Sequence, residues 1–205
     1  DISTIDLFYE IFIDRSYEKY KEIRKGDIVV DLGANVGIFS IKASRTIDEM
    51  GKVIAIEPEP LNVKLLRENT KNLKNILIIP KAAGKDSGKI ELTIGMHSGA
   101  HYIDKNNEDE DQRKVIVPID TIDNIFSDLN YKKIDFFKID IEGYELEALK
   151  GALKTLKITK FLSISTYHQK DEAFLIKDFL EKNNFKVIID SVGESKTYAW
   201  NKSQI

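Results

Sequence analysis

Hydrophobic positions along the chain follow two patterns, short β-branched runs and longer segments with helical spacing. The runs predict strands at Ile28–Leu32, Lys52–Glu57, Ile76–Ile79, Ile134–Asp140, Phe161–Thr166, Phe185–Asp190 and Lys196–Asn201. The longer segments predict helices at Ile38–Met50, Pro60–Leu73, Tyr144–Leu156 and Asp171–Asn183. Strands that alternate with helices of about 10–15 residues predict an α/β fold, a mostly parallel sheet with helices on both faces.

The N-terminal segment differs from this alternation. Apolar residues recur at mostly helical spacing over Ile2–Ile23, which predicts one amphipathic helix. The pair Gly26-Asp27 then breaks the pattern. We therefore expect a helical extension over residues 1–24 and a single domain over residues 25–205.

A second irregular region lies in the middle of the chain. Lys89–Ile94 and Lys114–Pro118 have the composition of strands with no helix between them, which predicts a β-hairpin insertion. The segment Asn106–Gln112 is almost entirely polar and is expected to be a surface loop. His97 and His101 precede it and are expected to belong to a lid or substrate loop.

Composition restricts the classes of partner. The 205 residues are 42% hydrophobic and 32% charged, with a net charge of -3 and no dense Lys/Arg cluster, so no nucleic-acid partner is expected. No stretch approaches the roughly 18 apolar residues needed to span a bilayer, and no membrane partner is expected. The absence of cysteine excludes disulfides, cysteine-ligated zinc and thiol catalysis. The chain opens at Asp1 without a basic-then-apolar leader, and we expect a cytoplasmic protein. The oligomeric state is not indicated.

A glycine loop, Asp31-Leu32-Gly33-Ala34-Asn35-Val36-Gly37, joins the first predicted strand to the first helix. In open α/β sheets, ligands bind beyond the carboxyl ends of such strands. Dinucleotides favour Gly-x-Gly-x-x-Gly here, a spacing that the loop lacks. The acid followed by Gly-x-Asn-x-Gly instead resembles the first motif of class I methyltransferases. This resemblance implies that the loop cradles the methionine part of S-adenosylmethionine, through Asp31, Gly33, Ala34, Asn35 and Gly37.

A carboxylate at the end of the second strand supports a nucleoside cofactor. Glu57 lies about 20 residues beyond the last loop glycine, where an acid commonly binds ribose hydroxyls. Dinucleotides and S-adenosylmethionine both have a ribose cis-diol, so Glu57 alone does not distinguish these two classes of cofactor. Pro58 stiffens the turn that follows, and Ala82 and Ala83 are small enough for an adenine ring to lie against.

A second cluster is more specific. Residues 136–145 read Phe-Phe-Lys-Ile-Asp-Ile-Glu-Gly-Tyr-Glu, and residues 117–123 and 164–168 flank them. Together with the glycine loop and Glu57-Pro58, they resemble the FkbM family of S-adenosylmethionine-dependent methyltransferases. The resemblance implies a Rossmann-like class I methyltransferase sandwich, with seven strands of which the last is antiparallel. It also implies methyl transfer to oxygen, on a hydroxyl of a small molecule, natural product or sugar.

The predicted ends of two later strands bring candidate catalytic residues to the same edge. Methyl transfer is an in-line displacement that depends on positioning, and a base or a metal helps an aliphatic hydroxyl to lose its proton. Asp140, Glu142 and His168 are the candidates, and Asp140 also lies where it can contact the cofactor. These residues could also hold a divalent cation, although we expect no metal. Turn capping, helix N-terminal stabilisation and surface hydrogen bonding are their structural alternatives.

Three other functions compete with this interpretation. An NAD-dependent oxidoreductase is disfavoured by the loop spacing. A methyltransferase of nucleic-acid bases would need a basic face and an Asn/Asp-Pro-Pro-aromatic motif, where the chain has Asp140-Ile141-Glu142-Gly143. A catalytically inactive protein that binds the cofactor or another protein stays open, because a fold does not imply a function.

Overall fold

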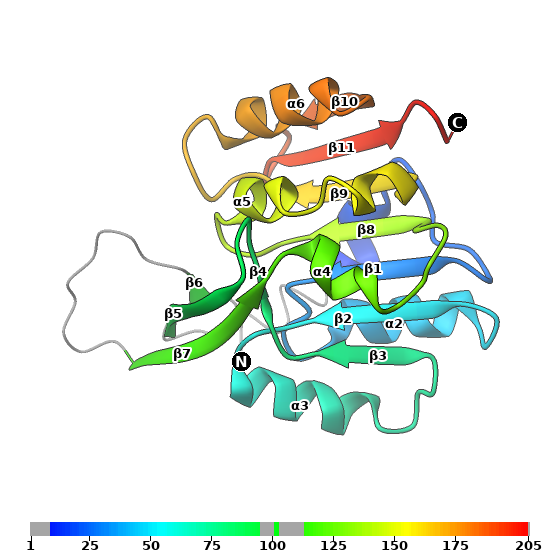
Figure 1. The fold of residues 1–205 in the computed structure, drawn as a ribbon. Helices are drawn as coiled ribbons and strands as arrows, with labels where there is room; N and C mark the ends of the chain where they lie inside the picture. The colour runs from blue at the N-terminus through cyan, green and yellow to red at the C-terminus, as the bar shows by residue number, and fades with distance from the viewer. Residues whose placement is uncertain (1–8, 95–100, 103–112, 205) are drawn as a thin grey trace.

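The structure, a computed structural model, describes residues 9–94 and 113–204 together with the backbone of residues 101–102 (Figure 1). Its seven-stranded sheet has the order β10-β11-β9-β8-β1-β2-β3, in which β11 runs antiparallel to both neighbours and all other pairs are parallel. The strands are β1 (Ile28–Leu32), β2 (Lys52–Ile56), β3 (Ile76–Ile79), β8 (Phe136–Ile139), β9 (Phe161–Ser165), β10 (Phe185–Asp190) and β11 (Lys196–Asn201). The predicted Rossmann-like sheet of seven strands, with the last strand antiparallel, is confirmed.

Helices cover both faces of this sheet, as its strands require. Successive strand residues point to opposite faces, and here both sets are apolar. On one face Val29, Val53 and Phe136 pack with α2, and on the other Val30, Ile54 and Phe137 pack with α4, α5 and α6. The helices are α2 (Ile38–Ile47), α3 (Pro60–Thr70), α4 (Ile122–Ser127), α5 (Glu145–Lys150) and α6 (Glu172–Lys182). No helix within the described residues has both the length and the apolar character to cross a bilayer.

Two helices differ from the sequence prediction. The helix predicted over Tyr144–Leu156 ends at Lys150, and a separate 3-10 turn, η3, follows at Thr155–Ile158. At Gly151 a Cβ would lie 2.1 Å from the backbone oxygen of Gly84, so the chain leaves the helix where it packs closely on a neighbouring segment. The short helix α4 was not predicted.

The insertion forms a small sheet of its own, which contains the predicted strand pair. Strands β5 (Gly88–Ile94) and β7 (Arg113–Asp120) are antiparallel, with β6 (His101–Tyr102) beside β5. Strand β4 (Ala82–Ala83) pairs in parallel with β7 and ties this sheet to the main domain. The predicted loop at Asn106–Gln112 and His97 lie outside the described residues, as does the side chain of His101.

The continuous helix expected over Ile2–Ile23 is wrong for the residues that the structure describes. A π-helical turn, η1 (Glu10–Asp14), ends at Arg15, whose φ of 51° is left-handed, and a 3-10 turn, η2 (Ser16–Glu18), follows. Tertiary contacts override the helical periodicity, since the Tyr198 hydroxyl donates to the Ser16 carbonyl and Tyr17 is buried against the sheet. The division at residue 24 stays a prediction.

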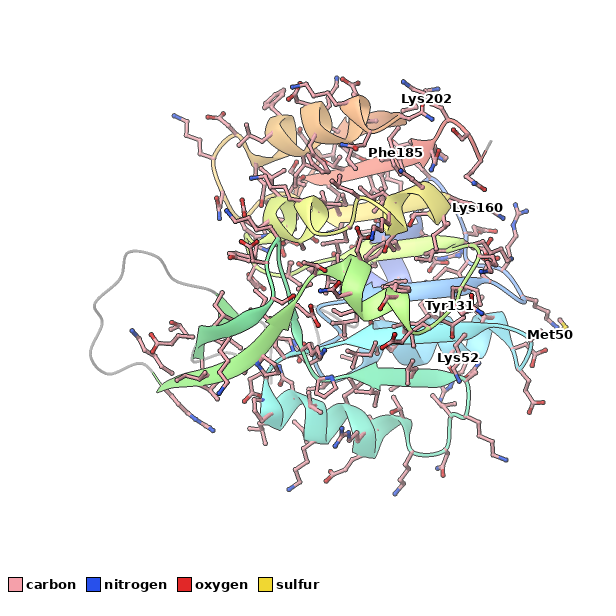
Figure 2. All side chains as sticks on the ribbon, viewed as in Figure 1. Met50, Lys52, Tyr131, Lys160, Phe185 and Lys202 are labelled. Carbon is pink, nitrogen blue, oxygen red and sulfur yellow. The ribbon has the colours of Figure 1, made fainter. Side chains whose placement is uncertain are left out.

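The two edges of the sheet have different roles. Five residues labelled in Figure 2 mark one edge: Lys52 and Phe185 begin strands, Tyr131 and Lys160 precede strands, and Lys202 follows the antiparallel β11. The parallel strands therefore end at the opposite edge, where the small β5–β7 sheet lies in Figure 1. This carboxyl edge is where open α/β sheets bind their ligands.

Candidate functional site

A cavity of about 970 Å³ lies at the carboxyl edge, within the size range of ligand pockets. It brings together most of the residues predicted to bind the cofactor and two of the predicted catalytic residues. These are Gly33, Ala34, Asn35, Glu57, Pro58, Ala82, Ala83, Asp140 and Glu142. Asp31, Gly37 and His168, also predicted, are not among the lining residues.

Gly33 begins the loop that follows β1. Its φ of 80° favours glycine, and a Cβ there would lie 1.8 Å from the backbone oxygen of Asp140. Gly37 has a φ of 94° and precedes α2, where a Cβ would lie 2.4 Å from Leu66 Cδ1. Gly33 thus brings the loop against the end of β8 beside the cavity, while Gly37 permits close packing of α2 on α3.

The Glu57 carboxylate fixes the loop from the end of β2. Its Oε2 accepts a hydrogen bond from Asn35 N at 2.8 Å, and its Oε1 accepts one from Glu59 N at 3.0 Å. Burial raises the pKa of Glu57 to about 7, although these hydrogen bonds oppose the shift. The carboxyl group therefore changes charge near neutral pH, at the wall of the cavity.

Asp31 is fully buried and does not face the cavity. Asp31 and Lys138 are direct neighbours across β1 and β8, and Lys138 Nζ lies 3.0 Å from Asp31 Oδ1. Ser40 Oγ donates to Asp31 Oδ2 at 2.6 Å, and Lys138 Nζ also donates to the Gly33 carbonyl at 2.8 Å. Burial opposes the charge on Lys138, but Asp31 and Asp140 outweigh it and raise the pKa of this lysine. Lys138 thus links the buried Asp31 carboxylate to the backbone of the glycine loop at Gly33.

Asp140 lies where β8 ends and lines the cavity. The Tyr17 hydroxyl donates to its Oδ2 at 2.5 Å. Burial opposes ionisation, but Lys138, the Tyr17 hydrogen bond, His168 and Lys196 together lower the pKa of Asp140. The carboxylate is therefore ionised at neutral pH and already oriented by a residue of the N-terminal segment.

His168 follows β9 and lies among carboxylates, with its side chain 8% exposed. Nε2 lies 3.2 Å from Glu142 Oε2 and 3.7 Å from Asp140 Oδ1, and Nδ1 lies 3.3 Å from Glu145 Oε1. Burial opposes protonation, but Glu142 and Glu145 outweigh it and raise the pKa of His168 to about 10. An imidazole with this pKa is protonated at neutral pH, so these surroundings do not favour the predicted role as proton acceptor.

The N-terminal segment closes one side of the cavity. Glu10 lines it, and Glu10 Oε1 lies 2.7 Å from Lys196 Nζ and accepts from Ser16 Oγ at 2.8 Å. Lys196 is buried, and its ammonium lies 4.6 Å from the centre of the Tyr17 ring. These contacts join the first described residues of the chain to the last strand, next to Asp140.

The family to which this chain belongs follows from comparison of its sequence. The sequence model described as "Methyltransferase FkbM domain" matches residues 31–187, which span the glycine loop, Glu57, Asp140 and His168. The chain belongs to the FkbM methyltransferase family.

Similarity to known relatives agrees with the assignment of this chain to the FkbM methyltransferase family. Methyltransferase sdnD of Sordaria araneosa is 24% identical over 216 residues, which cover 90% of this chain and 83% of the relative. The 31-O-demethyl-FK506 methyltransferase FkbM of Streptomyces tacrolimicus is 42% identical over 65 residues, 31% of this chain and 24% of its own. The crystal structure of Methyltransferase FkbM from Methylobacillus flagellatus matches with a TM-score of 0.66 at 20% identity, over 94% of this chain and 48% of that one. The chain thus spans about half the length of that structure, whose likeness shows the shared fold.

Several residues of this FkbM methyltransferase site were missed by the sequence prediction. Lys138 had a usable signal, since a lysine within an otherwise apolar buried strand needs an anionic partner. The Glu145 carboxylate accepts a hydrogen bond from the backbone N–H of Ile141, four residues earlier. Glu145 also belongs to the motif that indicated the family. Tyr17 and Lys196 come from distant parts of the chain, and no local pattern connects them with Asp140.

Proposed function

We propose that this FkbM methyltransferase transfers a methyl group from S-adenosylmethionine to a hydroxyl oxygen of a small molecule or carbohydrate. The observation that carries the proposal is the cavity that joins Glu57 and the glycine loop to the ionised Asp140. Its volume of about 970 Å³ is at the upper end for ligand pockets, which leaves room for an acceptor beside a cofactor. The cytoplasmic location and the expected absence of nucleic-acid and membrane partners stay predictions.

The cofactor half of the cavity has groups for each part of S-adenosylmethionine. The Glu57 carboxylate can accept hydrogen bonds from the ribose diol, and the small side chains of Ala82 and Ala83 leave space for the adenine. The loop after β1 offers backbone to the methionine part. Because Asp31 is engaged by Lys138 and Ser40, it supports the loop, and Asp140 is the carboxylate that meets the positive charges of the cofactor.

Methyl transfer from a sulfonium ion depends more on alignment of the acceptor oxygen with the methyl group than on activation of either reactant. The acceptor oxygen forms a bond to the sulfonium methyl carbon as the carbon–sulfur bond breaks, and S-adenosylhomocysteine leaves. Asp140 is ionised and can accept a hydrogen bond from the acceptor hydroxyl, which orients the oxygen lone pair. The protonated ether formed by the transfer is a far stronger acid than a carboxylic acid, so Asp140 or Glu142 can take its proton.

Methyl transfer tests this function directly. We expect the protein to form labelled ethers when methyl-labelled S-adenosylmethionine is supplied with a panel of sugars, polyols and natural-product alcohols. Asp140→Asn should abolish transfer, while Glu181→Gln, at an exposed carboxylate of α6 outside the cavity, should retain it. Label found only on amines or carboxylates would contradict transfer to hydroxyl oxygen. Cofactor binding without transfer to any acceptor would favour the inactive alternative.

Cofactor affinity should depend on pH through Glu57. Because the pKa of Glu57 is about 7, its ionised form is a minor species at pH 6 and the main species at pH 8. An ionised carboxylate accepts the ribose hydrogen bonds more strongly, so affinity for S-adenosylhomocysteine should rise about tenfold between these pH values. Calorimetric titration at both pH values measures the change. Glu57→Gln should abolish most of the pH dependence, and an unchanged tenfold rise in that variant would contradict the assignment.

A further inference from the structure

Three side chains meet beside the cavity with their ligand atoms facing one another. Asp140 and Glu142 belong to the turn after β8, and His168 to the turn after β9. One oxygen or nitrogen atom from each lies within 4.8 Å of the other two. Two carboxylates and an imidazole thus converge where Asp140 and Glu142 line the cavity.

The polar atoms in this cluster are poorly satisfied. Neither ring nitrogen of His168 nor Oδ1 of Asp140 makes a hydrogen bond of good geometry to a described residue, although Glu142 Oε2 lies 3.2 Å from Nε2 and Glu145 Oε1 lies 3.3 Å from Nδ1. The His168 side chain is more than nine-tenths buried, and its Nε2 points toward both carboxylates. Buried polar groups are stabilised by well-directed partners, and a cation bound between Nε2 and Oδ1 would give both atoms such a partner.

A further carboxylate supports His168 from behind. Glu145 is fully buried, and its Oε1 lies 3.3 Å from His168 Nδ1 and accepts a hydrogen bond from Ile141 N at 2.9 Å. Histidines that bind metals usually present their other ring nitrogen to a carboxylate or carbonyl, which fixes the tautomer and the ring orientation. Glu145 is placed to act in this way on Nδ1 of His168, which leaves Nε2 to face the ion.

A second group of potential ligands shares the same histidine. Glu145 and Glu172 lie with Nδ1 of His168, and one ligand atom of each falls within 4.8 Å of the others. Neither glutamate lines the cavity, and Glu172 is only 5% exposed. An ion on the Nε2 side, in contrast, would be next to the bound acceptor. The structure therefore favours the Nε2 side.

We propose that Asp140, Glu142 and His168 bind a first-row divalent cation of the Mn²⁺ type. A set of two carboxylates and one imidazole suits such ions better than Ca²⁺ or Mg²⁺, which prefer oxygen ligands alone. Binding displaces the proton from Nε2, as at other histidine ligands. The role of the ion rests on the proposed function: it would hold the acceptor hydroxyl near the methyl donor and lower the pKa of that hydroxyl.

Binding of Mn²⁺ alone tests the proposal. The full chain is stripped with a chelator and titrated with Mn²⁺, and electron paramagnetic resonance measures the free aquo ion. We expect one bound ion per chain and a rise of at least tenfold in the dissociation constant for Glu142→Gln and for His168→Gln. Glu181→Gln, at an exposed carboxylate of α6 outside the cavity, should leave the dissociation constant unchanged, and Glu172→Gln, on the Nδ1 side, should raise it less than Glu142→Gln does.

Three results would overturn the proposal. These are no binding by the unmodified chain, equal weakening by Glu181→Gln, or weakening by Glu172→Gln with unchanged binding in Glu142→Gln. Glu142 has a side chain that is 31% exposed, and its isosteric replacement should leave the thermal unfolding midpoint nearly unchanged. The titration uses neither methyl donor nor acceptor. A failure of Mn²⁺ binding is therefore distinguishable from a failure of methyl transfer.

Discussion

Replacing Gly33 by alanine should lower the free energy of unfolding by about 3–5 kcal/mol and abolish cofactor binding. The added Cβ would lie 1.8 Å from the backbone oxygen of Asp140, an atom that cannot turn aside as a flexible side chain could. The backbone at Gly33 also has a φ of 80°, which is unfavourable for alanine. Relief of the clash would separate the glycine loop from the end of β8, where the cavity lies.

Gly193→Ala is the matched control for this effect. Gly193 has a similar φ of 73°, but a Cβ there would meet no atom within 4 Å. It should lose only the backbone component, about 1–2 kcal/mol. Urea unfolding of both variants measures the two losses. Equal losses would show that the close approach of Gly33 to Asp140 is not what constrains the loop.

Replacing Lys138 by methionine should cost about 3–5 kcal/mol of unfolding free energy, because it leaves the buried Asp31 carboxylate without its cation. Asp31 is 0% exposed, and among the described residues only the Ser40 side chain would then hydrogen-bond to its carboxylate. The Gly33 carbonyl would lose its lysine donor as well. The double variant Lys138→Met/Asp31→Leu should recover much of the loss, since it removes the uncompensated charge.

An exposed ion pair of the same type provides the comparison. Lys182 and Asp178 pair on α6 with side chains 71% and 65% exposed, so Lys182→Met should cost less than about 1 kcal/mol. Urea unfolding of the unmodified chain, the two single variants and the double variant measures the loss of unfolding free energy in each. A loss in Lys138→Met no larger than that in Lys182→Met would contradict a structural role for the buried pair.

The central sheet was predictable because its strands are buried on both faces and therefore read as continuous apolar runs. Such a run leaves a strong signal even in a segment as short as β1. The N-terminal segment shows the opposite case, since its apolar spacing is helical but its contacts with the sheet determine its path. The helix α4 has only six residues and one capping signal, Thr121 Oγ1 accepting from Asn124 N, which is too little to predict a helix.

The placement of the proposed cofactor-binding residues was predictable for a topological reason. Parallel strands end at one edge, so Gly33, Glu57 and Asp140 had to lie near one another once β1, β2 and β8 were recognised. The direction in which a side chain points could not be predicted from the topology. Asp31 is expected from the sequence to meet the cofactor, whereas the register places it opposite Lys138, and it forms an ion pair there without lining the cavity. Tyr17 reaches Asp140 only through the tertiary fold.

Calorimetric titration with S-adenosylhomocysteine and with NAD decides whether the cavity binds a methyl donor, because both ligands have a ribose diol for Glu57 and only one fits the loop spacing. We expect micromolar binding of one S-adenosylhomocysteine per chain, lost in Gly33→Ala, and no measurable binding of NAD. Micromolar binding of NAD without any response to S-adenosylhomocysteine would contradict this expectation.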